Sequence, residues 1–253
     1  MINYNKILIK RFIPVLIIAL FIGHGANSQI LISLIFGDKL NSGNIEFGLE
    51  GGLNFSDFQN LDDSKRLSNL NLGFYFYLKQ SDRSYISTGV LVKSNQGADE
   101  LPPYSLGEPV LDSLFSMGGV TRTLSYFQVP IAYHYRFTSG FYLEAGFQIG
   151  LNFNAADVFK QTTVDDSELS LVIDTNDQYS TMDAGLLGGL GYKFKRNEQG
   201  LPGLSFGTKY YYGLVDISVG NFGELMNDNI YLYVRIPIGA GKAMAKDAES
   251  AGN

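Results

Sequence analysis

Residues 141–154, FYLEAGFQIGLNFN, alternate between two kinds of side chain. Every second residue is apolar, and the residues between them are polar, glycine or tyrosine. Because successive side chains of a β-strand point to opposite faces, this stretch predicts a strand with one wholly apolar face. That face needs a covering layer, and after residue 28 the sequence has no helical pattern that could supply one.

The same alternation predicts eight strands, separated by turn signals. Their ranges are 44–55, 67–78, 84–93, 122–137, 141–154, 182–194, 204–212 and 230–238. Soluble proteins average about 5–6 residues a strand, whereas a tilted strand that crosses a bilayer needs about 9–11. All eight predicted strands reach the longer length, and this favours strands that span a membrane.

The connections between these strands are predicted to be of two kinds. The long ones are 56–66, 94–121, 155–181 and 213–229, and the shorter ones are 79–83, 138–140 and 195–203. Long loops at one end and tight turns at the other are typical of outer-membrane barrels, whose turns face the periplasm. We therefore predict an all-β fold, an eight-stranded antiparallel transmembrane β-barrel with an up-and-down meander. A soluble β-sandwich is the alternative.

Aromatic residues on the apolar face are predicted to form two girdles at the lipid interfaces. The girdle near the periplasmic strand ends consists of Phe47, Phe76, Tyr135, Phe137, Phe141, Tyr192, Phe194 and Phe206. The girdle towards the outer ends consists of Phe55, Phe127, Phe153, Tyr210 and Tyr212. A general preference of aromatic residues for strands is the simpler explanation.

The chain begins like a secretory signal peptide. Lys6, Lys10 and Arg11 precede an apolar run over 12–22, and small residues occupy 26 and 28, so we expect cleavage after Ser28. A membrane anchor is less consistent with the sequence, because the run is short and contains Pro14. The predicted organisation is a signal peptide at 1–28, a pre-barrel periplasmic segment at 29–43, the barrel at 44–238 and a disordered tail at 239–253.

Charge and cysteine content exclude several classes of function. Residues 1–28 hold three of the 19 basic residues and no acidic one, so 16 basic residues remain against 25 acidic, a net charge of −9. That sign argues against nucleic acid as a partner. The chain has no cysteine, which excludes disulfides and thiolate metal sites.

The face opposite the apolar one carries the candidate site residues, and alternation directs them into the lumen. They are Glu46, Glu50, Lys93, His134, Arg136, Glu144, Asp183, Lys193, Lys209 and Arg235. An eight-stranded barrel is just wide enough for side chains to fill, so charges inside it must pair. We expect a lumen closed by ion pairs and by hydrogen-bonded Tyr, Asn and Gln. A narrow pore or a small-ligand site is the alternative.

Catalytic, metal and cofactor chemistry have little support in the residues. After residue 28, His134 is the one imidazole, with no second His or Cys to complete a metal site. The glycine-rich run 185–191 is not followed by the Lys-Ser/Thr of a phosphate loop. We therefore predict no enzymatic activity, no catalytic residues, no metal and no cofactor.

Acidic residues are concentrated in the predicted long loops. They are Asp57, Asp62, Asp63, Asp99, Glu100, Glu108, Asp112, Asp157, Asp165, Asp166, Glu168, Asp174 and Asp177. Binding of Ca²⁺, from the medium or as a bridge to lipopolysaccharide, is the alternative. However, these acidic residues have no liganding spacing, and a solvated loop is the simpler interpretation. The β-prone stretch 167–175 is expected to extend a hairpin above the membrane.

Four short motifs resemble the outer-membrane β-barrel family that includes PorT-like proteins. They are FGLEGGLNFS at 47–56, YFQVPI at 126–131, FYLEAG at 141–146 and GGLGY at 188–192, and the resemblance spans 45–238. It implies a porin-like barrel in a Gram-negative cell envelope, and some relatives support secretion or surface assembly. Barrels of this kind commonly end in an aromatic residue, whereas Ile236, Pro237 and Ile238 lead here into a polar tail.

These patterns together favour a structural, surface-interaction or secretion-assembly role. A narrow channel or small-ligand transport barrel is the first alternative, and a lipid-modifying barrel enzyme is a weaker one. The expected partners are outer-membrane lipid and lipopolysaccharide, the outer-membrane assembly machinery and an envelope protein.

Overall fold

The structure is a computed structural model that describes residues 44–59, 61, 64–162, 166–195, 203–219 and 224–238. Its elements are β1 (Ile45–Phe58), β2 (Lys65–Lys79), β3 (Ser84–Leu101), α3 (Pro109–Phe115), β4 (Gly119–Arg136), β5 (Phe141–Thr162), β6 (Glu168–Asp174), the 3₁₀ helix η1 (Asn176–Gln178), β7 (Met182–Lys193), β8 (Ser205–Gly213) and β9 (Asn227–Pro237). The predicted signal peptide, the segment 29–43 and the tail 239–253 lie outside the described residues.

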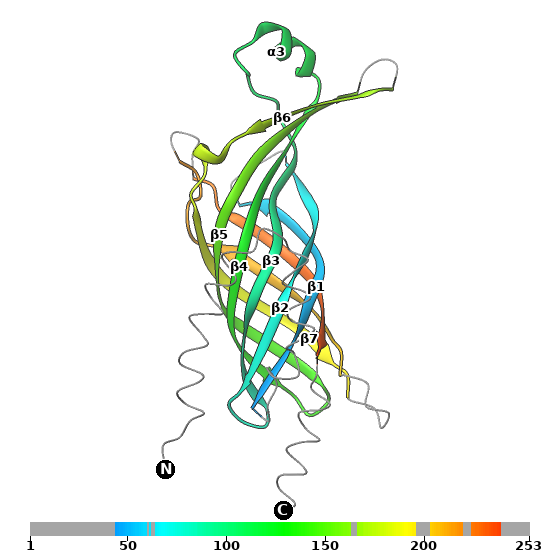
Figure 1. Cartoon of the computed structure of the whole chain (residues 1–253), viewed down its shortest axis with the longest axis vertical. Coiled ribbons are helices and arrows are strands. Elements are labelled where there is room, and N and C mark those ends of the chain that lie inside the picture. Colours follow the sequence, from blue (N-terminus) through cyan, green and yellow to red (C-terminus); the bar gives the residue numbers. More distant parts are fainter. Residues whose placement is uncertain are drawn as a thin grey trace, which may run out of the picture.

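Eight strands form a closed antiparallel ring, as the sequence predicts (Figure 1). The ring runs β1, β2, β3, β4, β5, β7, β8 and β9, and β9 pairs with β1 to close it. Leu53, for example, lies between Leu70 of β2 and Leu232 of β9. Because each strand pairs with its neighbours on both sides, the ring has no free edge whose backbone groups need covering.

The two ends of the barrel differ in their connections. Four residues, 80–83, separate β2 from β3, and four, 137–140, separate β4 from β5. At the opposite end, 102–118 join β3 to β4 and include α3, and 163–181 join β5 to β7 and include β6 and η1. The connection between β1 and β2 spans 59–64 and is shorter than predicted, because both strands continue further than their alternation indicates. We call the two ends the short-turn end and the long-loop end.

Three strands rise well above the rest of the barrel at the long-loop end (Figure 1). β3 and β4 have 18 residues each and β5 has 22, which is longer than predicted for all three. The upper part of β5 also pairs with β6, from Ala156↔Asp174 to Thr162↔Glu168. The predicted hairpin around 167–175 is thereby confirmed.

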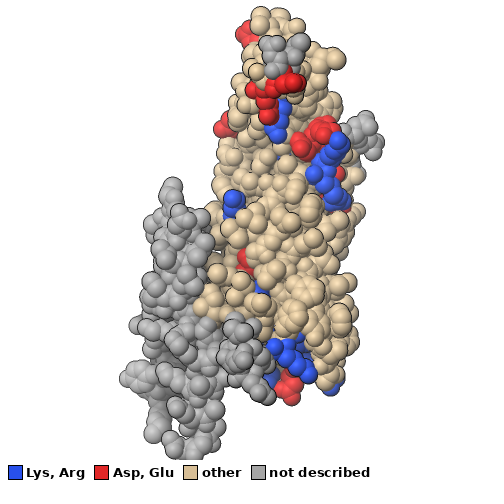
Figure 2. Space-filling model, turned by 90° about the vertical axis from the view of Figure 1, so that its right-hand side faces the viewer, with Lys and Arg blue, Asp and Glu red and all other residues tan. Residues whose placement is uncertain are grey.

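Apolar side chains cover the outside of the ring. Nine of them are 44–55% exposed: Leu53, Leu70, Leu143, Phe147, Leu186, Leu190, Leu232, Val234 and Ile236. Figure 2 shows that most charged residues on the face in view lie near the two ends of the molecule, with mainly uncharged residues between them. So much exposed apolar surface is unfavourable in water, and it is the band that a lipid bilayer covers.

Aromatic rings contact one another at both margins of this apolar band. Near the short-turn end, Phe141 lies 5.0 Å from Tyr192, and Tyr192 lies 5.2 Å from Phe194, between ring centroids. Near the long-loop end, the rings of Phe127 and Phe153 are 4.7 Å apart. The Phe141–Tyr192 and Phe127–Phe153 contacts join neighbouring strands, whereas Tyr192 and Phe194 are two residues apart along the chain. Such groups of rings are typical of the aromatic belts at the two interfaces of a bilayer.

An apolar cluster fills the interior of the long-loop end, and we call it the apolar cap. Its buried members are Phe58, Ala98, Leu101, Phe115, Val120, Leu124, Tyr126, Ala155, Phe159, Tyr179, Ile217 and Leu225. They come from β1, β3, β4, β5, α3 and the long loops, so the extended strands and the loops share one core. In the described part of the chain, no helix is both long enough and apolar enough to cross a membrane.

Candidate functional site

The lower lumen contains a buried cluster of charges, which we call the ion-pair cluster: Glu50, Glu144, Lys209, Arg235 and His134. Each of these side chains is at most 3% exposed. They come from β1, β4, β5, β8 and β9, and alternation directs all of them inward. Two carboxylates and two cations balance in charge, as a buried arrangement requires.

Arg235 is at the centre of the ion-pair cluster. Its Nε donates to Glu50 Oε2 at 2.5 Å, and its Nη1 donates to Glu144 Oε2 at 3.2 Å and to the Tyr77 hydroxyl at 2.5 Å. Lys209 Nζ donates to the other oxygen of Glu50 at 2.7 Å. Each charged group therefore has a partner of opposite sign, which compensates for the loss of water around it.

Tyrosines complete the ion-pair cluster. Tyr233 donates from its hydroxyl to Glu144 Oε1 at 2.6 Å, and its ring lies 4.4 Å from Lys209 Nζ and 4.6 Å from Arg235 Cζ. The hydroxyl oxygens of Tyr142 and Tyr233 are 2.9 Å apart and share a hydrogen bond. These tyrosines were not among the candidate site residues, although the same alternation places them on the inner face and could have identified them.

His134 has no exposed surface. Its Nδ1 lies 3.8 Å from Glu144 Oε2, and the rings of Tyr77 and Tyr142 lie 4.7 Å and 4.3 Å from the imidazole. A general acid or base must reach the atom with which it exchanges a proton. Enclosed by tyrosines and Glu144, the imidazole of His134 has no path to a substrate from outside the barrel.

A second ion pair lies nearer the short-turn end. Lys193 Nζ is 2.5 Å from Glu46 Oε1, and the Tyr75 hydroxyl donates to the same carboxylate at 3.0 Å. Arg136 lies against the rings of Tyr85 and Tyr77, with Cζ 4.5 Å and 5.8 Å from their centroids. This layer lies below the ion-pair cluster and also obstructs the lumen.

Two of the predicted lumen residues are not part of these two groups of charges. Lys93 is exposed on the outside, and its prediction as a lumen charge is wrong. The cause is a register shift in β3: Leu91 pairs with Gln128 but Ser94 pairs with Tyr126, so the irregular residues between them break the alternation. Asp183 points inward but is separate from the ion-pair cluster, and it accepts a hydrogen bond from Asn227 Nδ2 at 2.9 Å.

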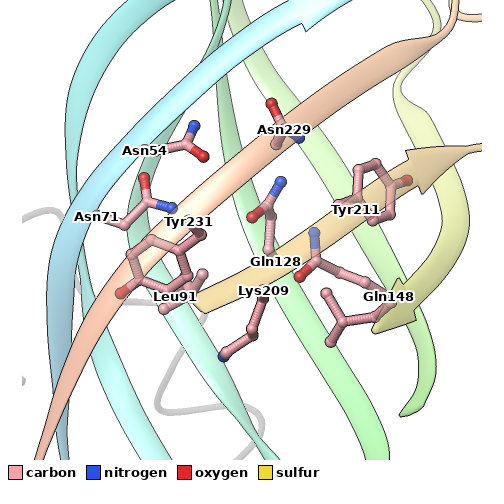
Figure 3. Close-up of a pocket in the computed structure, with 10 residues that line it drawn as sticks. Asn54, Asn71, Leu91, Gln128, Gln148, Lys209, Tyr211, Asn229 and Tyr231 are labelled. Atoms are coloured by element: carbon pink, nitrogen blue, oxygen red, sulfur yellow. The ribbon is translucent and has the colours of Figure 1, made fainter. Parts of the chain in front are cut away.

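Above the ion-pair cluster lies a layer of uncharged amides, which we call the amide layer: Asn54, Asn71, Gln128, Gln148 and Asn229. Together with Leu91, Leu187, Lys209, Tyr211 and Tyr231, they line a cavity of about 10 Å³. Figure 3 shows these side chains converging on the middle of the barrel from several strands. A cavity of this size has room for about one water molecule and for no larger ligand.

The upper parts of β4 and β5 carry a charged contact of their own. Arg122 binds Asp157 through two hydrogen bonds, from Nε at 2.9 Å and from Nη2 at 2.6 Å, and the Tyr104 hydroxyl donates to Asp157 at 3.1 Å. Burial and, next, the Asp157 carboxylate raise the pKa of Tyr104 to about 12, so its hydroxyl keeps its proton. Through Tyr104, the pair links β4 and β5 to the connection between β3 and β4 at 102–118, which contains α3 and which we call the α3 loop. Within the described ranges, no three His, Cys, Asp or Glu side chains gather into a metal site.

Comparisons with known proteins agree with this architecture. Residues 36–219 match the family model described as the outer membrane protein beta-barrel domain. The chain matches none of the curated proteins with which it was compared.

Similar solved structures are distant in sequence. Ail of Yersinia pestis, in complex with the heparin analogue sucrose octasulfate, is 10% identical with a TM-score of 0.41, over 77% of this chain and 99% of its own. Neisserial surface protein A is 10% identical with a TM-score of 0.36, over 76% and 96%. The outer membrane protein AlkL, determined in lipid bilayers, is 13% identical with a TM-score of 0.35, over 78% and 89%.

The family model covers most of the chain, and the closed eight-stranded ring with its apolar outer band is the fold that the family's description names. The chain belongs to the outer membrane protein β-barrel domain family.

Proposed function

We propose that this protein is a non-enzymatic outer-membrane barrel that acts through its long-loop end, and that its lumen is structural and does not conduct. The observation that carries the proposal is the filled interior. The ion-pair cluster, the amide layer and the apolar cap succeed one another along the barrel. Each layer removes space through which a solute could pass.

The long-loop end offers groups for interaction that the lumen lacks. In the α3 loop, Val110 and Met117 are 78% and 88% exposed, and Leu114 is also exposed. Exposed apolar side chains at the tip of a barrel are typical of contact surfaces. A surface-interaction or secretion-assembly role agrees with this placement. The resemblance to PorT-like proteins, the predicted signal peptide and the predicted partners remain part of the proposal.

A topology experiment tests this proposal. Because the sequence contains no cysteine, an introduced cysteine is the only thiol that the reagent can label. Single-cysteine variants Val110→Cys and Met117→Cys, treated in intact cells with a membrane-impermeant maleimide, should be labelled. Asp82→Cys, in the short turn between β2 and β3, is the matched control and should react only after the outer membrane is opened. Labelling of position 82 in intact cells, with 110 and 117 protected, would refute display of the α3 loop outside the cell.

The proposal also excludes catalysis by His134. Its imidazole is fully buried among Tyr77, Tyr142 and Glu144, where no lipid or peptide substrate reaches it. If purified protein modified a lipid or peptide and His134→Ala abolished that activity while the barrel stayed folded, the non-enzymatic function would be wrong.

A further inference from the structure

Several buried polar atoms around the cavity in the amide layer have no hydrogen-bond partner in the described part of the chain. They are Asn71 Oδ1, Gln128 Nε2, Asn229 Oδ1 and the hydroxyl of Tyr231. The four residues come from β2, β4 and β9, and each is at least 95% buried. Polar groups so far from solvent need a ligand that forms hydrogen bonds with them.

Leaving these atoms unpaired is costly. A buried donor or acceptor without a partner costs about 1–3 kcal/mol, and native proteins rarely keep several of them together. The orientation of Gln128 is set by Ser94, whose hydroxyl donates to Gln128 Oε1 at 3.0 Å. That bond leaves the Gln128 amide NH₂ as an unused donor, while Asn71 and Asn229 provide unused acceptors.

The cavity restricts what the ligand can be. Its volume of about 10 Å³ admits one water molecule and excludes an organic molecule. No carboxylate lines the cavity, so it offers no charged ligand for a cation. Lys209 is the one lysine in its lining and is already paired with Glu50 at 2.7 Å, which disfavours an anion. Water both donates and accepts, and it suits unused donors and acceptors together.

We propose that the amide layer is a binding site for internal water, held between the ion-pair cluster below and the apolar cap above. The water serves the free amide groups of Gln128, Asn71 and Asn229, which Figure 3 shows around the middle of the lumen. This water is enclosed and does not form a continuous path between the two ends of the barrel. The absence of such a path rests on the proposed non-conducting function.

Water–protein magnetisation transfer by NMR, on the refolded full-length barrel in perdeuterated detergent, tests the site. The side-chain NH₂ of Gln128 should show a cross-peak to water whose sign indicates a residence time of nanoseconds or longer. Gln80, exposed in the turn between β2 and β3, is the control and should report only rapidly exchanging water. A Gln128 signal with no water cross-peak, in a sample where Gln80 shows one, would mean a dry cavity and would overturn the inference.

Two variants keep the test independent of the folding of any one of them. Ser94→Ala removes the bond that orients Gln128 but leaves its NH₂, so the water cross-peak should persist. Gln128→Met keeps the side-chain length and removes the donor, so the water should be lost or exchange faster at Asn71 and Asn229. Unchanged exchange at both asparagines in Gln128→Met would overturn the role of Gln128.

The same experiment separates failure of this inference from failure of the proposed function. A dry cavity in a barrel that passes no current would refute only the water site. Water at Gln128 that exchanges as fast as at Gln80, in a barrel that carries unitary currents, would refute the enclosed site and the closed lumen together.

Discussion

At the scale of single residues, Arg235 determines whether the ion-pair cluster is neutral. Its guanidinium contacts both buried carboxylates, Glu50 and Glu144, and the hydroxyl of Tyr77. Lys209 forms an ion pair with only one of these carboxylates, Glu50. Without Arg235, Glu144 keeps the Tyr233 hydroxyl and the neighbouring His134 imidazole, but no lysine or arginine lies at salt-bridge distance. The ion-pair cluster would then hold two carboxylates and one lysine.

We therefore expect Arg235→Met to lower the free energy of unfolding by about 3–5 kcal/mol, the usual effect of removing one partner of a buried pair. Urea titration of the barrel in lipid vesicles, followed by its heat-modifiable migration in gels, measures this. Lys65→Met is the matched control, because it breaks an exposed pair with Glu100 at 2.6 Å and should cost less than about 1 kcal/mol. Equal effects of the two variants would show that burial of the pair does not matter.

At the scale of elements, Asp216 organises the loop between β8 and β9. Its Oδ1 accepts hydrogen bonds from the backbone N–H groups of Leu225 and Ser218 and from the Ser218 hydroxyl, each at 2.9 Å. Chiefly the Leu225 and Ser218 N–H bonds hold the pKa of Asp216 below its ordinary value of 3.8. The carboxylate therefore stabilises the folded loop above pH 3.8, and this contribution is lost as the pH falls through the lower folded-state pKa.

Hydrogen exchange should reveal this dependence. The protection factor of the Leu225 amide is expected to fall between pH 5 and pH 2.5 in the native protein, and to change much less in Asp216→Asn, which cannot titrate. The Thr175 amide, bonded to the Ala155 carbonyl at 3.0 Å, serves as the internal reference. A Leu225 protection factor that stays constant in the native protein would contradict the role of the ionised carboxylate.

The elements also show where inference from sequence succeeded and where it stopped. Alternation was sufficient to predict the eight ring strands and the inward direction of Glu50, Glu144 and Arg235, because the period of two is maintained through their strands. It failed at Lys93, because a register shift in β3 interrupts the period there. It also missed Ser94–Leu101, whose small and polar residues show no alternation and are held as a strand by pairing with β4.

Partners within the candidate site were less predictable than its location. Alternation along the strands directs Lys209 and Glu50 into the lumen. Whether the two side chains meet depends on how the strands are staggered around the ring, and a local sequence pattern does not encode that stagger. The apolar cap was not foreseen for a similar reason. Its members, such as Leu124, Phe159 and Ile217, are far apart in sequence and meet only because β4 and β5 extend beyond the band and the loops fold inward.

At the scale of the whole molecule, the barrel is apolar outside, and its interior changes from charged to apolar between the short-turn end and the long-loop end. Paired charges fill the lumen near the short-turn end, amides surround a small cavity in the middle, and apolar side chains close the long-loop end. An ion that entered would have to displace paired charges and then cross the apolar cap without compensation. Both steps are unfavourable, so the interior stabilises the barrel and leaves the long-loop end to interact.

The most direct test of this account is the electrical conductance of the purified, refolded barrel in a planar lipid bilayer. A closed lumen predicts no stable unitary current steps in 1 M KCl, at protein amounts for which a general porin inserts and conducts, with insertion verified by protection of the strands from protease. Reproducible unitary steps that scale with salt concentration, from protein of verified purity, would contradict the closed lumen and make the barrel a channel.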